Sequence, residues 1–309
     1  MSPDTPHRPV YADPRWPSAG EWFAASRTDG DGGPTQPVDL GLLGVPAHST
    51  SISTTGAHLT PGAVRDALRR FSTWATSMQS DLRALAVADL GDVPEPDGAA
   101  GEERTRAMLS GWTGRLLVAL GGDNSITYAV SRAMNADGLV TLDAHHDVRD
   151  GQSNGSPVAR LIDAGLDGRR VVQIGISDYA NSREDADRAH DFGITVIHRD
   201  EVQQRGIAEV MRNALDLAGA GHGSRVHVDL DVDVCDQAVA PACPASLPGG
   251  LSAYELRQAA RIAGSDPRVV SVDLVEVDVT RDGPDLRTVR LVAACVLEAA
   301  AGLLLQNGT

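Results

Sequence analysis

Residues 139–147 read LVTLDAHHD, a short apolar run that leads directly into two aspartates and two histidines. Three other apolar runs also end in polar clusters: RLLVAL (115–120) before GGDN, RVHV (225–228) before DLDVD, and RVVSVDLV (268–275) before Glu276. The runs are almost continuous in Val, Leu and Ile, which is typical of strands covered on both faces. In an open α/β sheet the carboxyl ends of the strands form the ligand-binding crevice, so these four ends predict one shared site.

Apolar runs and helical patterns alternate along the rest of the chain. The runs cover residues 38–45, 115–120, 139–142, 170–176, 194–198, 225–230 and 268–275. The helical patterns begin at Pro61, Asn124, Glu201 and Ser252, the last with a capping box to Glu255, and an apolar helix spans roughly 286–305. This alternation predicts an α/β fold, a three-layer α/β/α sandwich around a mostly parallel sheet.

The domain organisation follows from composition. Residues 1–36 are rich in Pro, Gly, Asp and Ser and predict a partly ordered N-terminal arm. Residues 37–309 predict a single domain, because strands of the same kind resume after GDVPEPDGAAGEE (91–103), which we interpret as a loop.

The chain is acidic: 27 Lys and Arg stand against 42 Asp and Glu in 309 residues, a net charge of −15. Such a chain repels phosphate backbones and anionic lipids, so we expect no nucleic-acid and no membrane partner.

The sequence has no run of 18 apolar residues and no apolar core of a signal peptide. Cys235, Cys243 and Cys295 fit no zinc pattern and are interpreted as buried side chains in a reducing compartment. We therefore predict a cytoplasmic protein.

The carboxylates of the predicted crevice indicate a metal site. Four aspartates would crowd together there, and like charges stay ionised only if a cation neutralises them. Alternate residues share one face of a strand, which groups Asp231 with Asp233 and groups Asp143, His145 and Asp147. Oxygen ligands with one imidazole suit Mn²⁺ better than zinc. Two such ions would generate a hydroxide nucleophile at neutral pH.

Each cluster also has a plain structural interpretation. DAHHD alone would serve as a helix cap with a solvated charge pair, DLDVD as a turn cluster, and GGDNS as an ordinary strand-to-helix turn. Their joint occurrence at strand ends favours the metal site. His146 alternates with the ligand-type residues, so we expect it to face away from them as a core or hydrogen-bonded histidine.

Together these motifs resemble the ureohydrolase family of arginase, agmatinase and formimidoylglutamase. The resemblance rests on GGDNS (121–125), DAHHD (143–147), DLDVD (229–233) with Pro241, GGLS (249–252) and LVEVD (274–278), and it covers nearly everything from residue 38 to 305. DAHHDVRDGQSNGSPV and VVQIGISDYANS look most like the formimidoylglutamase branch. The resemblance implies an arginase-like fold, a small-molecule substrate and a homo-oligomer, either a trimer or a hexamer.

The resemblance implies two manganese ions. Asp143 and Asp231 would bridge the ions, His145 and Asp233 would complete one of them, and Asp147 and Asn124 would belong to the other. The family has the histidine of a GGDHS motif at the position of Asn124. An amide oxygen is neutral and a weaker ligand than imidazole, so the ion beside Asn124 is expected to bind loosely or to be absent.

Further residues would handle the substrate. By resemblance, Asp147 would hold the nucleophile by a hydrogen bond and Glu276 would bind the amidine or guanidine group. Asn154 stands at the place of the family's proton-shuttling histidine, although an amide cannot relay protons at neutral pH. On the same turn, Arg149 would receive an anionic end of the substrate, with Ser153 and Asn154 beside it. An ion pair of Arg149 with a neighbouring aspartate is an equally good interpretation.

Three functions fit these features. The first is a manganese-dependent hydrolase of a linear amidine C–N bond, with N-formimino-L-glutamate from histidine degradation as the substrate. The second is a guanidino hydrolase of the arginase or agmatinase kind. The third is a catalytically impaired binding protein, suggested by Asn124 and Asn154 in place of two histidines, although the intact carboxylates argue against it.

Overall fold

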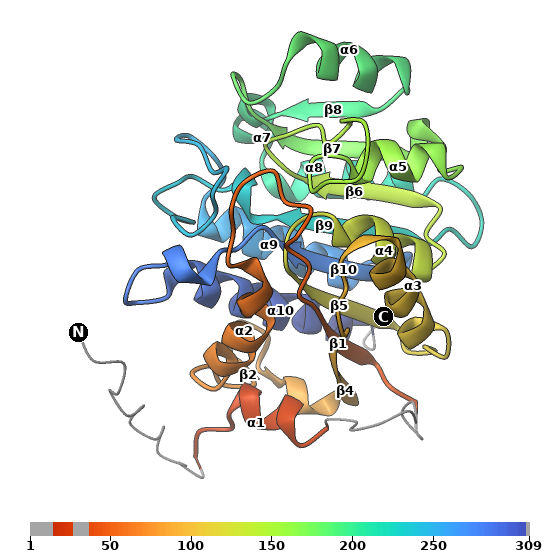
Figure 1. Ribbon diagram of the computed structural model, residues 1–309. Coiled ribbons are helices and arrows are strands. Elements are labelled where there is room, and N and C mark those ends of the chain that lie inside the picture. The colour runs from red at the N-terminus through yellow and green to blue at the C-terminus, as the bar shows by residue number, and fades with distance from the viewer. Residues whose placement is uncertain (1–14, 27–36, 307–309) are drawn as a thin grey trace.

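The computed structural model describes residues 15–26 and 37–306. Its centre is an eight-stranded sheet in the order β4-β1-β5-β10-β9-β6-β7-β8, and every neighbouring pair is parallel (Figure 1). The strands are β1 Leu40–Val45, β4 Val87–Asp92, β5 Leu116–Gly121, β6 Gly138–Leu142, β7 Val171–Ile176, β8 Thr195–His198, β9 Val226–Asp231 and β10 Val269–Val275. This arrangement confirms the predicted α/β fold.

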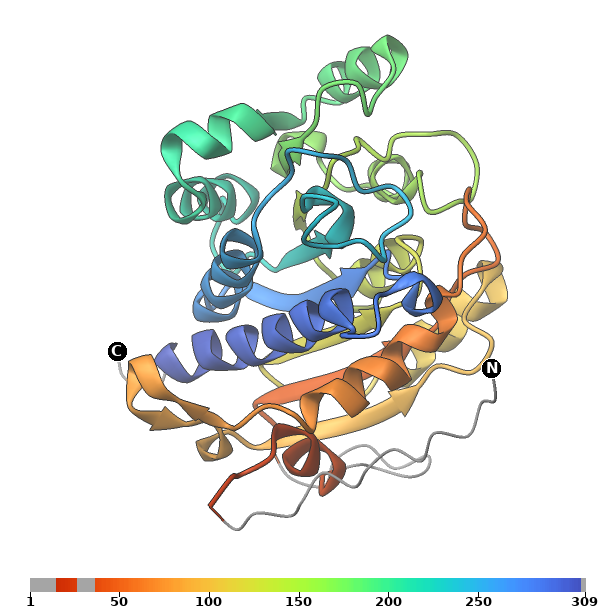
Figure 2. The same cartoon turned by 90° about the vertical axis from the view of Figure 1, so that its left-hand side faces the viewer.

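Helices cover both faces of the sheet. One face carries α2 Thr60–Leu68, α7 Arg199–Arg205, α8 Ile207–Ala218, α9 Ala253–Ser265 and α10 Arg287–Leu305, whereas the other carries α3 Gly98–Leu109, α4 Ile126–Ala133, α5 Pro157–Asp163 and α6 Arg183–Asp191. Figure 2 shows α10 and α2 side by side on the first face. The remaining elements are α1 Ala19–Ala24, the short pair β2 Trp74–Ala75 and β3 Ser80–Asp81, and six 3₁₀ turns, η1 Ala57–Leu59, η2 Thr76–Met78, η3 Leu82–Ala84, η4 Gly168–Arg170, η5 Val232–Val234 and η6 Val279–Arg281.

The core explains why the strands are apolar without alternation. In β5, Leu116, Val118 and Leu120 pack into the cluster with α2 and α10. Leu117 and Ala119 of the same strand pack into the opposite cluster with α4. A strand with helices on both faces buries every side chain, which removes the period-2 pattern of a half-exposed sheet.

Two elements were not foreseen in residues 87–109. The segment 91–103 is not simply a loop, because β4 extends to Asp92 and α3 begins at Gly98. The strand β4 was not predicted because its sequence contains two aspartates. One of them, Asp89, is buried, and the guanidinium of Arg65 in α2 donates to both of its carboxylate oxygens at 2.8 and 2.9 Å. A buried charge is tolerated in a strand when it is paired in this way.

The helix boundaries differ in two places. The helix expected from Asn124 begins at Ile126, and the single helix expected from Glu201 is two helices, α7 and α8, separated at Gly206 with a φ of 83°. Glycine adopts such a positive φ without the steric cost that other residues have. The capping box at Ser252 and Glu255 is present as predicted.

Among the described residues, α10 is the one helix long and apolar enough to cross a membrane, with a mean hydropathy of 1.9. However, 72% of that stretch is buried inside the protein, where it packs against α9 and α2. It is therefore interpreted as a core helix. Cys235, Cys243 and Cys295 are free and buried, as expected.

Part of the predicted N-terminal arm is described. Helix α1 buries Ala19 and Phe23 in the main core cluster, and the backbone N–H of Ala19 donates to the carbonyl of Phe71 at 2.9 Å. Residues 1–14 and 27–36 of the arm lie outside the described residues. The division into an arm and one domain over 37–309 stays a prediction.

Candidate metal centre

The four strands with polar carboxyl ends are neighbours in the sheet, in the order β5-β10-β9-β6. Residues at the ends of β10, β9 and β6 line one cavity of about 140 Å³. Seven of the predicted site residues line it: His145, Asp147, Arg149, Asn154, Asp231, Asp233 and Glu276. The ends of β10, β9 and β6 thus contribute to one cavity, whereas Asn124, which follows β5, and Asp143, which follows β6, do not line it.

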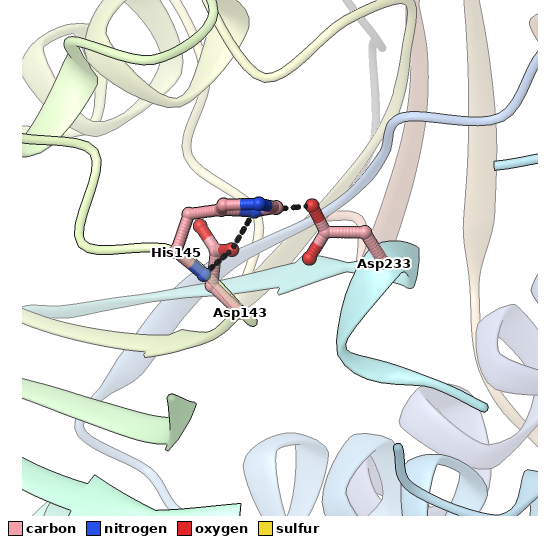
Figure 3. Close-up of side chains that lie close together, drawn as sticks. All are labelled: Asp143, His145 and Asp233. Carbon is pink, nitrogen blue, oxygen red and sulfur yellow. Dashed lines mark hydrogen bonds and ion pairs between the residues drawn. The ribbon is translucent and has the colours of Figure 1, made fainter. Parts of the chain in front are cut away.

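One group of ligand-type atoms joins β6 to β9. His145 Nδ1 lies 2.7 Å from Asp233 Oδ2 and 3.4 Å from Asp143 Oδ1 (Figure 3). One ligand atom from each of the three side chains lies within 4.8 Å of the others, so they could hold one metal ion together. The backbone sets this geometry, since the N–H of His145 donates to Asp143 Oδ1 at 2.6 Å and that of Ala144 to Asp233 Oδ1 at 3.0 Å.

A second group consists of Asp231, Asp233 and Cys243, whose ligand atoms also lie within 4.8 Å of one another. Strand alternation does not produce this pairing, because β9 ends at Asp231 and a 3₁₀ turn follows. The N–H of Asp233 instead donates to Asp231 Oδ1 at 2.8 Å. Sequence reasoning missed Cys243, although it stands two residues after Pro241 of the quoted motif. Burial raises the pKa of its thiol well above the ordinary value, which keeps it protonated and a poor metal ligand.

Asn124 lies beside Asp147, as the resemblance implied. Its amide nitrogen Nδ2 donates to Asp147 Oδ2 at 2.6 Å, and its backbone N–H donates to Glu276 Oε1 at 2.8 Å. The oxygen Oδ1 points the other way and accepts a hydrogen bond from the hydroxyl of Thr127 at 2.6 Å. Thus the structure brings Asn124 to the predicted place but turns its NH₂ group, rather than its oxygen, toward Asp147.

Two acidic residues of the cavity have left-handed backbone conformations. The φ angle is 52° at Asp147 and 64° at Glu276. A positive φ costs a non-glycine residue on the order of 1 kcal/mol or more, and such strain persists where surrounding contacts hold the backbone. Here the N–H of Glu276 donates to the carbonyl of Gly122, and the carbonyl of Asp147 accepts from the N–H of Ala159. The backbone is therefore held so that both carboxylates line the cavity.

Burial dominates the electrostatics of the carboxylates. It raises the pKa of Asp143 and Asp231 well above the ordinary value, and the charge of Asp233 adds to the effect. Burial also raises the pKa of Asp147 to about 7 and that of Glu276 to about 8. The cavity therefore resists holding all of these side chains as anions.

His145 and Asp233 form an ion pair in the same cavity. Burial alone would lower the pKa of His145, but the charge and hydrogen bond of Asp233 raise it to about 9. Burial would raise the pKa of Asp233, yet His145 lowers it below its ordinary value. A metal ion bound here would have to displace the proton of His145.

These residues fit a divalent cation. The cluster has more carboxylates than cationic partners, because Asp147, Asp231, Asp233 and Glu276 share the cavity with the one imidazole of His145. Carboxylate oxygens with a single imidazole form the kind of ligand set that Mn²⁺ accepts.

The substrate-side residues fall into two groups. Arg149 is exposed at the cavity, and no ion pair with Asp147 or Asp150 is found in the described chain, because Asp150 pairs with Arg188 at 2.6 Å. The ion-pair interpretation of Arg149 is thus not supported. Ser153 does not line the cavity; its hydroxyl accepts from the N–H of Gly155 at 3.3 Å and holds the turn.

Asn154 connects Glu276 to another loop of the cavity by two hydrogen bonds. Its Nδ2 donates to Glu276 Oε1 at 2.8 Å, and its Oδ1 accepts from the N–H of Ile52 at 2.9 Å. The side chain therefore links Glu276 to the loop around residue 52. This is a positioning contact, and the amide has no proton to relay at neutral pH.

Seven residues that line the cavity were not predicted, and Asn181 and Asp185 are among them. Asn181 accepts from the N–H of His146 at 2.9 Å and donates to the carbonyl of Ala144 at 3.0 Å, so it braces the loop after β6. Asn181 belongs to the stretch VVQIGISDYANS (171–182), which is part of the family resemblance. His146 itself turns away as predicted and bonds Gln173 Oε1 through Nδ1 at 2.7 Å.

Comparison with known proteins decides the family. Residues 38–302 match the model of the family described as the arginase family. The chain belongs to this family. Formimidoylglutamase of Bacillus subtilis (strain 168) is 32% identical over 279 residues, 85% of this chain and 87% of the relative. Formimidoylglutamase of Halalkalibacterium halodurans is 34% identical over 283 residues, 87% and 88% of the two chains.

Solved structures of the family agree. The B. subtilis formimidoylglutamase structure matches with a TM-score of 0.87 and 29% identity, covering 98% of this chain and 96% of that one. Trypanosoma cruzi formiminoglutamase, solved with Mn²⁺, matches with a TM-score of 0.79 at 22% identity, covering 86% of this chain and 93% of that one. The arginase-like fold is thus confirmed.

Proposed function

We propose that this protein is a manganese-dependent hydrolase that cleaves a C–N bond of N-formimino-L-glutamate. One observation carries the proposal: a single cavity combines buried carboxylates that fit a cation, the carboxylate of Glu276, and Arg149 without an ion pair in the described chain. The similarity to two formimidoylglutamases over most of their length supports the same substrate.

The metal ligands would be the six predicted side chains. Asp143, His145, Asp231 and Asp233 would hold one manganese ion, with Asp143 and Asp231 shared with a second ion beside Asn124 and Asp147. Bound manganese would lower the pKa of water and supply a nucleophile at neutral pH. The other functions belong to the side chains themselves.

Glu276 would bind the formimino group. Hydrogen bonds from the backbone of Asn124 and the side chain of Asn154 hold its Oε1, which leaves the other carboxylate oxygen for the substrate. A cationic formimino nitrogen would favour the ionised form of Glu276, whose pKa is about 8 without such a partner. Asp147 would accept a hydrogen bond from the nucleophile. Addition of water to the formimino carbon and cleavage of its bond to the glutamate nitrogen would give L-glutamate and formamide, whereas cleavage of its other C–N bond would give N-formyl-L-glutamate and ammonia.

Arg149 would select the substrate. N-formimino-L-glutamate has two carboxylates, and a guanidinium group at the cavity entrance can bind a carboxylate with two parallel hydrogen bonds. Agmatine has no carboxylate and would gain nothing from this arginine. A homo-oligomer of three or six chains and a cytoplasmic location are further parts of the proposal, based on the resemblance and the composition.

The test compares N-formimino-L-glutamate, arginine and agmatine side by side with added Mn²⁺, and measures ammonia, formamide and urea. We expect the highest kcat/KM with N-formimino-L-glutamate and the lowest with agmatine. Faster turnover of agmatine would refute the substrate assignment, and absence of all three products would favour the binding-protein alternative.

Variants of Arg149 refine this test. Arg149→Ala should raise KM for N-formimino-L-glutamate with little change in kcat, because a contact made equally in the ground and transition states appears in KM. Arg149→Lys should restore only part of the binding, since a point charge lacks the planar fork. The matched control is Arg169→Ala, an exposed arginine that pairs with Asp167 and does not line the cavity. An unchanged KM in Arg149→Ala would remove this arginine from substrate binding.

A further inference from the structure

The side chain of Arg149 lies across the backbone of Gly155 in the wall of the cavity. A Cβ atom placed on Gly155 would lie 2.9 Å from Arg149 Cδ and 3.3 Å from Arg149 Nε. The same atom would lie 3.0 Å from Cδ1 of Ile52, and all three residues line the cavity. The absence of a side chain at position 155 therefore leaves the space that the Arg149 side chain occupies, with Ile52 at its border.

The backbone conformation of Gly155 does not itself require glycine. Its φ lies outside the left-handed region, in contrast to Gly151 of the same loop, which has a φ of 84°. Alanine can adopt the backbone conformation of Gly155, so the effect of alanine there would come from the contacts of its methyl group. Gly155 is buried although it stands in a loop at the cavity, which agrees with side chains packed over it.

Hydrogen bonds hold the two backbone segments that meet at this point. The N–H of Arg149 donates to the carbonyl of Gly155 at 3.0 Å, which closes the loop that carries both residues. The N–H of Ile52 donates to Asn154 Oδ1 at 2.9 Å, which keeps Ile52 beside this loop. The guanidinium of Arg149, in contrast, has no hydrogen bond or ion pair within residues 15–26 and 37–306. Its direction is therefore set by the packing of its side chain on Gly155 and Ile52.

We propose that Gly155 and Ile52 are positioning residues that direct the guanidinium of Arg149 into the cavity and so favour a substrate with an anionic end. This inference rests on the proposed function, in which Arg149 binds a carboxylate of the substrate. A long arginine side chain loses rotamer freedom on binding, and contacts that restrict it beforehand reduce this cost. A methyl group at position 155 would take the space and turn Arg149 aside. Only a flexible side chain would have to move, so the variant is expected to fold.

The first experiment measures kcat and KM of Gly155→Ala in the Mn²⁺-loaded protein. We expect KM for N-formimino-L-glutamate to rise by about 3- to 30-fold, a part of the roughly 10- to 100-fold that complete loss of hydrogen bonds to a charged group causes. The value of kcat should change little, because this contact is made equally in the ground and transition states. The matched control is Gly111→Ala, an exposed position where nothing lies within 4 Å of the added atom. An unchanged KM in Gly155→Ala, or a loss confined to kcat, would overturn the proposal.

Ile52→Ala is the second variant. Ile52 is 58% exposed, so its truncation should leave the fold intact, and the backbone hydrogen bond to Asn154 remains. We expect KM to rise in the same direction as in Gly155→Ala, because the Arg149 side chain loses one border of its space. An unchanged KM would remove Ile52 from this role.

A double-mutant comparison separates positioning of Arg149 from a general effect on the loop. If Gly155 acts through Arg149, then Gly155→Ala should not raise KM further in an Arg149→Ala background. The same rise in both backgrounds would show that the methyl group disturbs the loop itself, and would overturn the proposal.

Crystal structures of the wild type and of Gly155→Ala decide the inference without any substrate. A guanidinium of Arg149 that points into the cavity in the wild type and away from it in the variant supports the proposal. The same position of Arg149 in both structures contradicts it. Absence of turnover in the wild type would count against the proposed function alone, so the two failures are seen separately.

Discussion

At the scale of single residues, the cavity depends on side chains whose orientation is held by neighbours. Glu276 has two donors on one carboxylate oxygen, Asn124 from the backbone and Asn154 from its side chain. Both asparagines, which the sequence alone allowed to be read as marks of lost chemistry, therefore have definite contacts in the structure. Their placement favours an enzyme adapted to asparagine at these positions over one that has decayed.

Glu276→Gln tests the carboxylate directly. The amide keeps the size of the side chain and can still accept from Asn124 and Asn154, but it presents no charge to a cationic formimino group. Because hydrogen bonds to charged groups contribute about 1.5–3 kcal/mol, we expect turnover to fall roughly 10- to 100-fold while manganese content stays unchanged. The control Glu298→Gln removes a carboxylate that pairs with Arg257 and Arg261 outside the cavity, and should leave kcat unaltered. Full activity of Glu276→Gln would make Glu276 a structural residue.

Asn124→His tests the weak ligand. We expect imidazole to raise the affinity for the second manganese ion by about tenfold or more, judged from the size of ligand-environment effects. Wild-type protein should retain close to one ion per chain after mild chelation, and the variant closer to two, by elemental analysis. Two equally tight ions in the wild type, or an unchanged titration in Asn124→His, would show that this position does not limit metal binding.

At the scale of elements, helices α9 and α10 pack so closely that two glycines have no room for a side chain. A Cβ atom on Gly302 would lie 2.1 Å from the carbonyl oxygen of Arg261, and one on Gly264 would lie 2.1 Å from that of Ala299. Both obstacles are backbone atoms, which cannot move without separating the helices. The contact between the two helices therefore depends on glycine, although glycine is a poor helix former.

Gly302→Ala should consequently destabilise the protein. In an open helix the same change stabilises by about 0.5–1 kcal/mol, but here the overlap should cost roughly 1–3 kcal/mol, as overpacking does in other cores. The free energy of unfolding in urea measures the difference. The matched control is Gly62→Ala in α2, where nothing lies within 4 Å of the added atom and a small gain is expected. A stabilised Gly302→Ala variant would contradict the close packing of α9 on α10.

At the scale of the whole molecule, the buried carboxylates couple stability to pH and to metal. The pKa of Glu276 is about 8 in the folded protein against an ordinary 4.5, and that of Asp147 is about 7 against 3.8. The pKa of His145 is shifted in the same direction, from an ordinary 6.5 to about 9. Each group binds more protons in the folded than in the unfolded state between its two pKa values, so its stabilising contribution is complete at low pH and is lost as pH rises through the folded pKa.

We therefore expect the metal-free protein to lose thermal stability between roughly pH 5 and about pH 9, over the window that these pKa values define. The pKa of Asp233 is lowered instead, so its ionised form stabilises the folded protein. This stabilisation is already complete above pH 5 and does not change the expected loss of stability between pH 5 and pH 9. Mn²⁺ requires the deprotonated ligands, so the rise in Tm on adding Mn²⁺ should grow with pH. Thermal unfolding with chelator and with Mn²⁺ measures both effects. A metal-free protein that becomes more stable from pH 5 to 9 would contradict this account of the cavity.

The sequence by itself determined the α/β fold and the acidic character of the site. Continuous apolar runs such as RLLVAL (115–120) encode burial on both faces, and a polar residue directly after a strand must lie at its carboxyl end. These are local properties, readable without knowing which strands are neighbours. They were sufficient to predict Asp231 and Glu276 at one crevice.

Only the tertiary structure decided which atoms meet. The order β5-β10-β9-β6 joins strands far apart in the chain, and the pairing of Asp89 with Arg65 that lets β4 stay buried comes from a separate helix. The contacts of Asn124 with Asp147 after β6 and with Glu276 after β10 likewise join elements that are distant in the chain. Hydrogen bonds between distant elements leave no periodic pattern in the sequence, because each depends on the fold being complete before its two partners are close.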